Sequence, residues 1–155
     1  MQDFLPYAWF EGKCIPFKDA KVSIATHALH YGTGAFGGMR AIPNPSNKNE
    51  FLLFRTDKHV KRLTQSAKLL LTEISEDYIF NAIETIIKIN KPSNPIYIRP
   101  FVYTSDLGIA PRLHNIETDF FIYCIELGDY LSPDGVSCRM SSWTRQEDRS
   151  LPLRG

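Results

Sequence analysis

The stretch "TDKHVKRLTQSAKLLLTEISEDYIFNAIETIIKI", residues 56–89, decides the fold class, because its apolar residues follow the period of an α-helix twice in succession. A first amphipathic helix is predicted over 56–71, with Thr56 or Asp57 placed to cap its first turn. A second helix is predicted from about Glu76 to Ile89, where acidic residues at the start and a lysine at the end match the helix macrodipole. Two helices therefore follow each other without a strand between them.

Strand-like segments rich in aromatic and β-branched residues lie on both sides of this helical pair. Before the pair come a hairpin over 7–17 that turns at Glu11-Gly12-Lys13, a strand over 35–42, a loop over 43–49 and a strand over 50–54. After the pair come strands over 96–104, 119–127 and 136–143, of which 119–127 is apolar enough for the centre of a sheet. Helices grouped in one block predict an α+β fold, a two-layer domain with a mainly antiparallel sheet and helices on one side.

Length and charge limit the classes of partner. A chain of 155 residues that is 43% hydrophobic is one ordinary domain with a substantial core. Eighteen lysines and arginines against seventeen acids give a formal charge of +1, and the basic residues are scattered. We therefore expect neither a nucleic-acid partner nor a membrane partner. The amino terminus lacks a basic region before an apolar run, so we expect an unexported, cytoplasmic protein.

The cysteines and histidines do not form a metal-binding pattern. Cys14, Cys124 and Cys138 are odd in number and widely spaced, which predicts reduced, buried thiols rather than disulfides or a zinc site. His27 and His30 are three residues apart, but no acid or cysteine completes a ligand set beside them. We expect packing or capping roles for both histidines and no metal.

The segment "HYGTGAFGG", residues 30–38, contains G-x-G-x-x-G at Gly32, Gly34 and Gly37. A dinucleotide-binding loop needs a buried strand before these glycines and a helix after them. The prolines in the segment 39–47 prevent a helix of useful length there. The glycines are therefore interpreted as permitting a tight, close-packed chain reversal.

Two arginines are placed where an anion could meet them. Tyr97 and Arg99 share one face of the 96–104 strand, because successive side chains of a strand alternate between its faces. Arg62 borders the apolar stripe of the first helix, from which a long side chain can carry its charge to a cleft. An ordinary ion pair or a solvated position is the commoner explanation for each arginine, and the residue pattern alone leaves the anion-binding interpretation open beside it.

The segment "HALHYGTGAFGGMRA", residues 27–41, resembles the branched-chain amino acid aminotransferases, which are pyridoxal-phosphate enzymes of fold type IV. Other segments resemble the same family in the same order: "AWFEGKCIPFKDAKVS" (8–23), "LFRTDKHVKRLTQSAKLL" (53–70), "YIRPFVY" (97–103), "LGDYL" (127–131) and "SSWTRQEDRSLPLRG" (141–155). The resemblance implies that residues 1–130 form an N-terminal α/β-sandwich domain, the small domain of this fold. Residues 131–155 would begin the second, pseudobarrel domain.

The resemblance also implies roles for individual residues. Arg62 matches the arginine that binds the phosphate of pyridoxal 5'-phosphate. Tyr97 and Arg99 match residues of the substrate site, where Arg99 would bind the distal carboxylate of glutamate or 2-oxoglutarate. The remaining substrate-binding positions are Phe36, Tyr130 and, from the opposite subunit, Tyr31 for the branched side chain, with Arg40 beside that tyrosine.

The sequence departs from the family pattern at two pocket positions and at its end. Many relatives have an acid where this chain has Gly37 and a large aromatic residue where it has Leu127. The family's Schiff-base lysine would directly follow Gly155, so no catalytic residue is expected within the 155 residues themselves.

The function implied by the resemblance is a branched-chain amino acid transaminase. It would transfer an amino group reversibly between leucine, isoleucine or valine and 2-oxoglutarate, in branched-chain amino acid biosynthesis, as a homo-oligomer that is at least a dimer. A D-amino acid transaminase and an aminodeoxychorismate lyase share the fold and the cofactor and remain alternatives. A non-catalytic small-molecule-binding or dimerisation domain is an alternative of another class.

Overall fold

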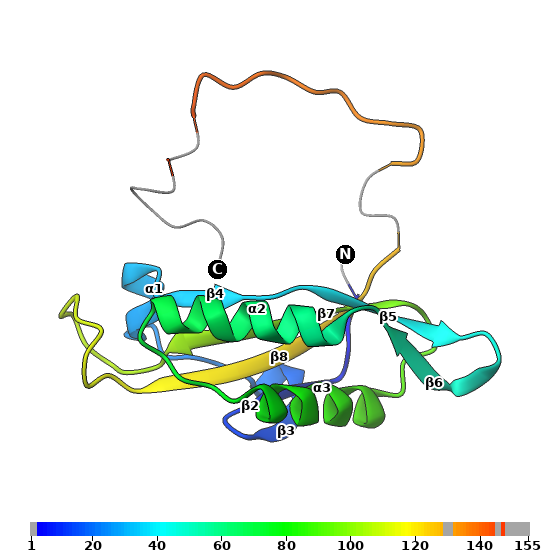
Figure 1. Ribbon diagram of the computed structural model, residues 1–155, viewed down its shortest axis with the longest axis horizontal. Helices are drawn as coiled ribbons and strands as arrows, with labels where there is room; N and C mark the ends of the chain where they lie inside the picture. Colours follow the sequence, from blue (N-terminus) through cyan, green and yellow to red (C-terminus); the bar gives the residue numbers. More distant parts are fainter. Residues whose placement is uncertain (1–2, 129–131, 145–146, 148–155) are drawn as a thin grey trace.

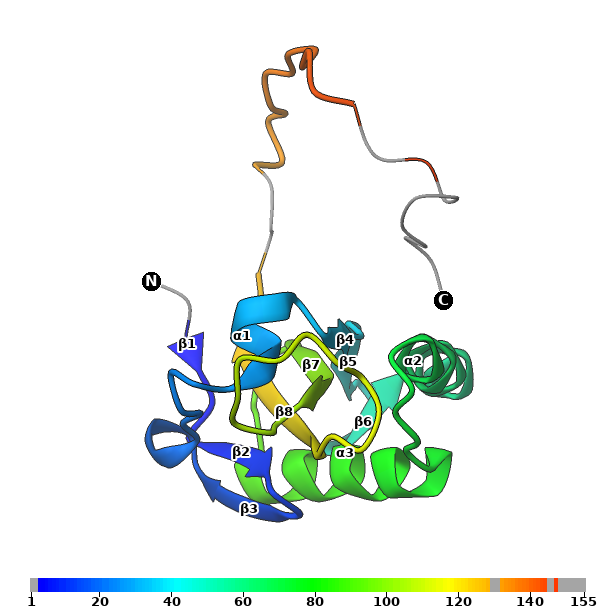
Figure 2. The same ribbon diagram turned by 90° about the vertical axis from the view of Figure 1, so that its left-hand side faces the viewer.

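Two helices and the sheet that they cover form the two layers of the structure (Figures 1 and 2). The computed structural model describes residues 3–128, 132–144 and 147. Helices α2 (Thr56–Leu69) and α3 (Glu76–Asn90) pack on one face of the sheet. All strand pairings are antiparallel among the described residues. The predicted α+β fold is confirmed.

The sheet has the strand order β3-β2-β8-β7-β5-β6, with β1 paired to β8 and β4 paired to β7. Its strands are β1 (Asp3–Phe4), β2 (Tyr7–Phe10), β3 (Lys13–Pro16), β4 (Gly34–Phe36), β5 (Met39–Asn44), β6 (Asn47–Leu53), β7 (Ile96–Thr104) and β8 (Thr118–Glu126). A 3-10 helix (Phe17–Asp19) and the short helix α1 (His27–Tyr31) complete the elements. The prediction that the 119–127 segment is central is confirmed, because β8 lies between β2 and β7.

The two faces of β7 have opposite chemistry. Ile96, Ile98 and Val102 are buried against α2 and α3, in the hydrophobic core. Tyr97 and Arg99 alternate with them and therefore lie on the face that these helices leave open. We call this second surface the open face of the sheet. One face of β7 therefore packs in the hydrophobic core, and its other face carries polar and aromatic side chains.

The amino-terminal hairpin is confirmed, but its turn is one residue shorter than predicted, because Lys13 already belongs to β3 and pairs with Phe10. Strands β2 and β3 are joined by Glu11 and Gly12, which have φ values of 49° and 76°. Positive φ at both central residues suits a two-residue hairpin, since its twist then matches that of the strands.

The prediction of a loop over 43–49 is wrong, because these residues form a tight hairpin between β5 and β6. Strand β5 extends to Asn44, the chain turns at Pro45 and Ser46, and β6 begins at Asn47. Pro43 is tolerated in the strand because β7 pairs with β5 only at residues 39–41, so this end of β5 has β6 as its single neighbour.

The strand predicted over 136–143 is also absent from the structure. The described residues 132–144 contain no strand, and all of them are exposed. A strand requires a hydrogen-bonded neighbour, and the described part of the sheet pairs none of its strands with this segment. Periodicity alone could not reveal the missing partner.

The two long helices begin in different ways. Ser75 accepts a hydrogen bond from the Tyr78 amide at 3.1 Å and so caps α3. For α2 the predicted cap at Thr56 or Asp57 is wrong: the residue before the helix is Arg55, which has φ of 55° and gives no side-chain cap hydrogen bond.

We expect Ser75→Ala to lower the free energy of unfolding by about 1 kcal/mol, because the first turn of α3 loses its side-chain acceptor. Urea denaturation followed by circular dichroism measures the loss. Ser93→Ala, at an exposed serine beyond the end of the same helix, is the matched control. Equal stabilities of the two variants would contradict the capping role.

Candidate functional site

Arg99 lies on the open face between two aromatic rings. Its guanidinium carbon is 4.3 Å from the ring centroid of Phe36 and 5.1 Å from that of Tyr97. Its Nε atom is buried and has no hydrogen-bond partner in the part of the chain that the structure describes. A buried donor without an acceptor is costly, so this guanidinium is suited to receive an anion. The prediction of an anion-binding arginine on this strand is consistent with that geometry.

Strand pairing brings Phe36 to Arg99. In the β4–β7 ladder Phe36 lies opposite Phe101, two residues beyond Arg99. The rings of Phe36 and Phe101 stack at 6.2 Å, and Phe101 stacks on Phe121 of β8 at 5.0 Å. The stacked rings of Phe36, Phe101 and Phe121 therefore form a row on the open face, and the Arg99 guanidinium lies at its Phe36 end.

The glycine segment is close-packed as predicted, but the chain turns only at its start, at Gly32, and not at Gly34 or Gly37. Strands β4 and β5 both run antiparallel to β7, so the chain continues in one direction past Gly37. A Cβ at Gly34 would lie 2.5 Å from the Phe101 ring, and a Cβ at Gly38 would overlap the Tyr97 hydroxyl. Because glycine has no side chain, the backbone at Gly34 can pack on the Phe101 ring and the backbone at Gly38 can pack on Tyr97. The turn itself is made earlier by Gly32, which ends α1 with φ of 65°.

Arg40 is held beside this cluster by the backbone that follows β8. It lies opposite Tyr97 in the β5–β7 ladder and is exposed. Its Nη2 donates to the carbonyl oxygens of Leu127 and Gly128 at 3.1 and 3.4 Å. Arg40 therefore fixes the start of the segment that leads to Tyr130, a predicted site residue that lies outside the described residues.

Arg62 occupies a different element. It is exposed on α2, which packs against β4 and β7, the strands that carry Phe36 and Arg99. Within the described residues Arg62 forms no hydrogen bond or ion pair with the Arg99 cluster. His59, three residues earlier, has a buried Nδ1 without a hydrogen-bond partner among those residues. Sequence reasoning missed His59, although a spacing of three on a helix places it beside Arg62.

Tyr31 is the last residue of α1, whereas Phe36 lies in β4, the next strand along the chain. The Tyr31 hydroxyl donates to the carbonyl oxygen of Ile109, in the loop between β7 and β8. His27 of the same helix is buried, with hydrogen bonds at both ring nitrogens, so the predicted packing role is confirmed. The structure brings Phe36 and Tyr97 to Arg99 and places Arg40 opposite Tyr97, whereas Tyr31 lies on α1 and contacts His27 and the β7–β8 loop.

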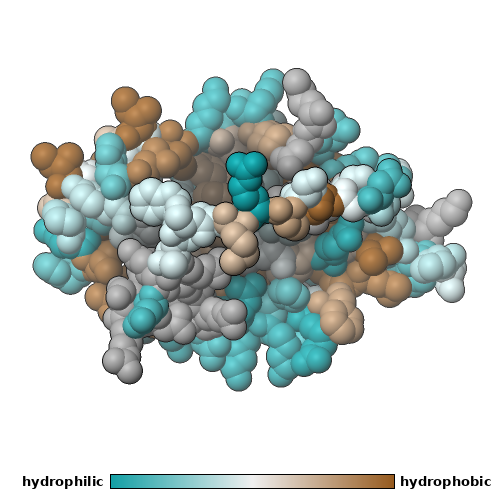
Figure 3. Space-filling view, turned by 90° about the horizontal axis from the view of Figure 1, so that it is seen from above, coloured by the Kyte–Doolittle hydropathy of each residue, from teal (hydrophilic) through white to brown (hydrophobic). Residues whose placement is uncertain are grey.

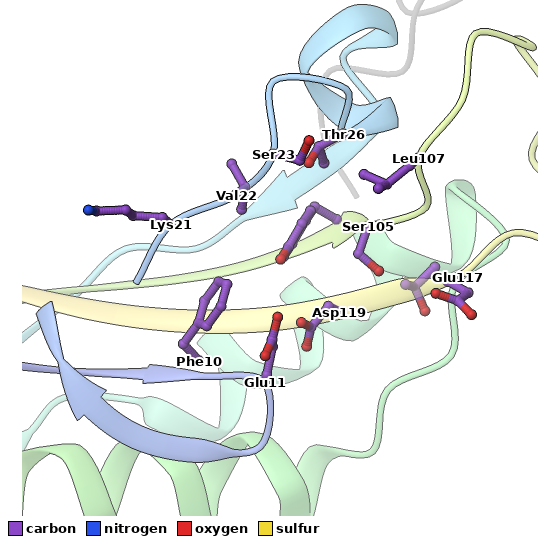
Figure 4. A pocket seen from close by; sticks show the side chains of 12 residues that line it. Phe10, Glu11, Lys21, Val22, Ser23, Thr26, Ser105, Leu107, Glu117 and Asp119 are labelled. Atoms are coloured by element: carbon purple, nitrogen blue, oxygen red, sulfur yellow. The ribbon is translucent and has the colours of Figure 1, made fainter. Parts of the chain in front are cut away.

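A cavity of about 570 Å³ lies further along the open face (Figure 4). Glu11 of the β2–β3 turn and Asp119 of β8 lie side by side in it. Burial raises the pKa of the Asp119 carboxyl, and the Glu11 charge acts in the same direction. Burial, followed by the charges of Asp119 and Glu11, also raises the pKa of Tyr103. Phe36, Tyr97 and Arg99 are not among the residues that line this cavity, so it is distinct from the arginine site.

Comparison with known proteins gives the family. The chain matches the amino-transferase class IV family over residues 34–154. This chain belongs to that family. It is 61% identical over 155 residues to a probable branched-chain-amino-acid aminotransferase of Synechocystis sp., covering 100% of this chain and 51% of that protein. It is 35% identical over 153 residues to a protein of the same name from Aquifex aeolicus, covering 97% and 49%.

Solved structures of class IV relatives have the same fold. A branched-chain aminotransferase from Thermoproteus uzoniensis with norvaline has a TM-score of 0.86 and 28% identity, covering 98% of this chain and 50% of that one. A branched-chain amino acid aminotransferase from Thermobaculum terrenum, in its PLP-form, has a TM-score of 0.80 and 28% identity, covering 97% and 50%. The chain spans about half the length of the curated relatives it matches. The family resemblance seen in the sequence is confirmed.

Three further observations concern the cysteines, the potential metal ligands and the helices of the described residues. Cys14, Cys124 and Cys138 are free, but Cys14 is only half-buried and Cys138 is exposed, so the prediction of buried thiols holds for Cys124 and is wrong for the other two. No group of three or more potential metal ligands occurs among the described residues. None of the helices described is both long enough and apolar enough to span a bilayer.

We expect Asp119→Asn to alter the pH dependence of stability. A carboxyl with a raised pKa binds more protons in the folded than in the unfolded protein, so its contribution to the free energy of unfolding falls as pH rises from about 4 through the folded pKa. The variant lacks this fall. Urea denaturation across that range should show wild type losing stability relative to Asp119→Asn. Glu73→Gln, at an exposed carboxyl, is the control, and parallel curves for wild type and Asp119→Asn would contradict the assignment.

Proposed function

We propose that this chain is the amino-terminal part of a branched-chain amino acid aminotransferase that uses pyridoxal 5'-phosphate. The reaction transfers an amino group reversibly between leucine, isoleucine or valine and 2-oxoglutarate. The observation that carries the proposal is the buried Nε of Arg99, which has no hydrogen-bond partner in the described chain and lies between two aromatic rings. The names of the relatives support this substrate class over the D-amino acid transaminases and aminodeoxychorismate lyases of the same fold.

The domain division follows from the same proposal. Residues 1–130 form the amino-terminal α/β domain, and residues 131–155 begin the second domain, with the Schiff-base lysine expected directly after Gly155. The exposure of the described residues 132–144 supports this division, because they include large apolar side chains such as Met140 and Trp143. Side chains of this kind are suited to burial against a further domain.

The residues of α2 fit the phosphate of the cofactor. Arg62 supplies a permanent positive charge, and the buried Nδ1 of His59 lacks a hydrogen-bond partner in the described chain. A phosphate oxygen would give both groups an acceptor, and charge-assisted hydrogen bonds are stronger than neutral ones. Pyridoxal phosphate, when bound, supplies the electron sink for cleavage of bonds at the substrate Cα. The role of α2 is to hold and orient the cofactor through its phosphate.

Arg99 explains how one pocket accepts both a charged and an apolar substrate. The distal carboxylate of glutamate can receive two parallel hydrogen bonds from the planar guanidinium. The flanking rings of Phe36 and Tyr97 limit the access of water, which strengthens that interaction. When a leucine side chain is bound instead, the same rings provide apolar contact, and their faces continue to stabilise the cation.

The remaining site residues build the apolar wall and its support. Phe36 and Tyr130 contact the branched side chain, and Tyr31 reaches the pocket of a second subunit in a homodimer. Arg40 positions the segment before Tyr130 by binding the carbonyl oxygens of Leu127 and Gly128. We further propose that the dimer acts in the cytoplasm, in branched-chain amino acid biosynthesis.

The experiment that tests the function uses the complete protein as purified. Its visible spectrum, before and after borohydride reduction, shows whether pyridoxal phosphate is covalently attached. Transamination of 2-oxoglutarate is then measured with leucine, isoleucine, valine and D-alanine as amino donors. A colourless protein without transaminase activity would favour a non-catalytic binding or dimerisation domain and contradict the proposal. Preference for D-alanine would favour a D-amino acid transaminase.

We expect Arg99→Ala to raise the KM for glutamate about tenfold to a hundredfold and to change the KM for leucine much less, because only glutamate uses the charge-assisted hydrogen bonds. Steady-state kinetics with each amino donor measure the two effects. Arg99→Lys keeps the charge without the paired donors and should fall between the two. An equal rise for glutamate and leucine would show that Arg99 does not bind the distal carboxylate.

We expect Arg62→Ala to weaken binding of pyridoxal phosphate about tenfold to a hundredfold, because a charged phosphate ligand is lost. Equilibrium dialysis or fluorescence titration of the cofactor-free complete protein measures the dissociation constant. Lys61→Ala removes the same charge from the neighbouring position of α2 and is the matched control. If both variants weakened binding equally, long-range charge rather than a direct contact would be responsible.

A further inference from the structure

The loop between β7 and β8 is fastened to α1 at several points. Thr26, directly before the helix, forms an isolated bridge with Leu107. The amide of His27 donates to the carbonyl oxygen of Asp106 at 2.9 Å. Figures 1 and 2 show that α1 and this loop lie at the same end of the molecule. These backbone contacts bring the side chain of His27 to the loop.

The imidazole of His27 joins the loop to the sheet. Its Nε2 lies 3.0 Å from the carbonyl oxygen of Ala110, and its Nδ1 lies 2.9 Å from the Thr33 hydroxyl and 3.0 Å from the Thr104 hydroxyl. A carbonyl oxygen only accepts, so Nε2 donates, and Nδ1 of the neutral ring accepts from a threonine hydroxyl. The residue is 2% exposed, and these bonds form away from bulk water. His27 therefore connects Ala110 in the loop with the residue before β4 and the last residue of β7.

Tyr31 holds the adjacent carbonyl of the loop. It follows His27 by one helical turn, its ring lies 4.5 Å from the His27 ring, and its hydroxyl donates to the oxygen of Ile109. Residues four apart on a helix share one side, so the two side chains hold consecutive peptide groups. We call this pair and its two carbonyls the loop clasp. The clasp fixes the Tyr31 ring and residues 109–110 relative to each other.

The loop clasp supports an exposed apolar surface. Ile109 is 88% exposed and Leu107 is 61% exposed, and Leu29 of α1 lies among the exposed apolar residues as well. Figure 3 shows hydrophobic side chains gathered at the end of the molecule that carries α1 and this loop. A loop has few contacts to define its conformation, so the buried hydrogen bonds of His27 are a principal constraint on this surface.

We propose that His27 is a positioning residue of the substrate site, which fixes Tyr31 and residues 107–110 as one apolar wall for the branched side chain. The inference rests on the proposed function, in which Tyr31 belongs to the apolar pocket of a second subunit. His27 itself touches no substrate and acts through Ala110 and Tyr31. The wall contacts the branched side chain, whereas the distal carboxylate of glutamate is bound by Arg99. Loss of the loop clasp should therefore affect branched substrates selectively.

The test compares His27→Asn with His27→Gln in the complete protein. The longer glutamine amide can still donate to the Ala110 carbonyl, whereas asparagine is too short to do so. We expect His27→Asn to raise the KM for leucine about tenfold, while kcat and the KM for glutamate stay within about twofold. His27→Gln should restore most of the leucine KM. His30→Gln is the matched control, because His30 lies on the same helix but is exposed and bonds only the Ile24 carbonyl among the described residues.

Hydrogen exchange of the amides in residues 105–117 supplies a readout that does not depend on catalysis. Exchange should be faster in His27→Asn than in wild type and close to wild type in His27→Gln. Equal leucine KM values for the two variants, an equal rise for leucine and glutamate, or unchanged exchange in His27→Asn would each overturn the proposal.

Two further outcomes remain decisive. If His27→Asn does not fold, Tyr31→Phe removes the hydroxyl from the other half of the loop clasp. Faster exchange in residues 105–117 would then support the proposal, and unchanged exchange would overturn it, because a change in the leucine KM alone could follow from the direct contact of Tyr31 with the substrate. If the wild-type protein does not transaminate, the proposed function fails, and the exchange comparison alone decides whether His27 fixes the loop.

Discussion

The alternation of side chains along β7 is the constraint on which the rest of the structure depends. Strand β7 pairs with β4, β5 and β8, so its register sets the positions of all three neighbours. Its inward residues, such as Ile98, are fully buried beneath the helices, and its outward residues include Arg99. Because side chains alternate strictly, the packing that fixes Ile98 also fixes the direction of Arg99. A slip of one residue would bury the guanidinium in the core.

The elements that local patterns determine could be predicted from the sequence. The helix over 76–89 and the strand over 96–104 agree with α3 and β7 to within a residue, because a continuous apolar stripe or alternation defines each of them. The failures depend on distant partners. The end of β5 is a strand because β6 returns beside it, and 136–143 is not a strand because no described strand pairs with it. A linear pattern does not contain that information.

The residues of the candidate site also divide into those that a local pattern predicts and those that only the fold brings together. Tyr97 and Arg99 share a face by alternation alone, so their proximity could be predicted. Phe36 reaches them only through the β4–β7 register, and the family resemblance rather than any periodicity singled it out. His59 was missed because the burial of one ring nitrogen is a property of the folded chain that the local sequence does not reveal. Local reasoning finds groups on one element, whereas a site made by several elements requires either the fold or a resemblance.

The way in which Arg99 is held bears directly on its use. The described residues give it no carboxylate partner, and its contacts are instead the faces of Phe36 and Tyr97. A carboxylate partner would occupy the same N–H donors that a substrate carboxylate needs, so binding would require an exchange of partners. Ring faces stabilise the positive charge without using those donors. The stacked row that continues from Phe36 through Phe101 restricts the movement of the first ring. The guanidinium is thus placed by packing while its buried Nε stays without a hydrogen-bond partner among the described residues, which is the arrangement that the proposed site for alternating charged and apolar ligands requires.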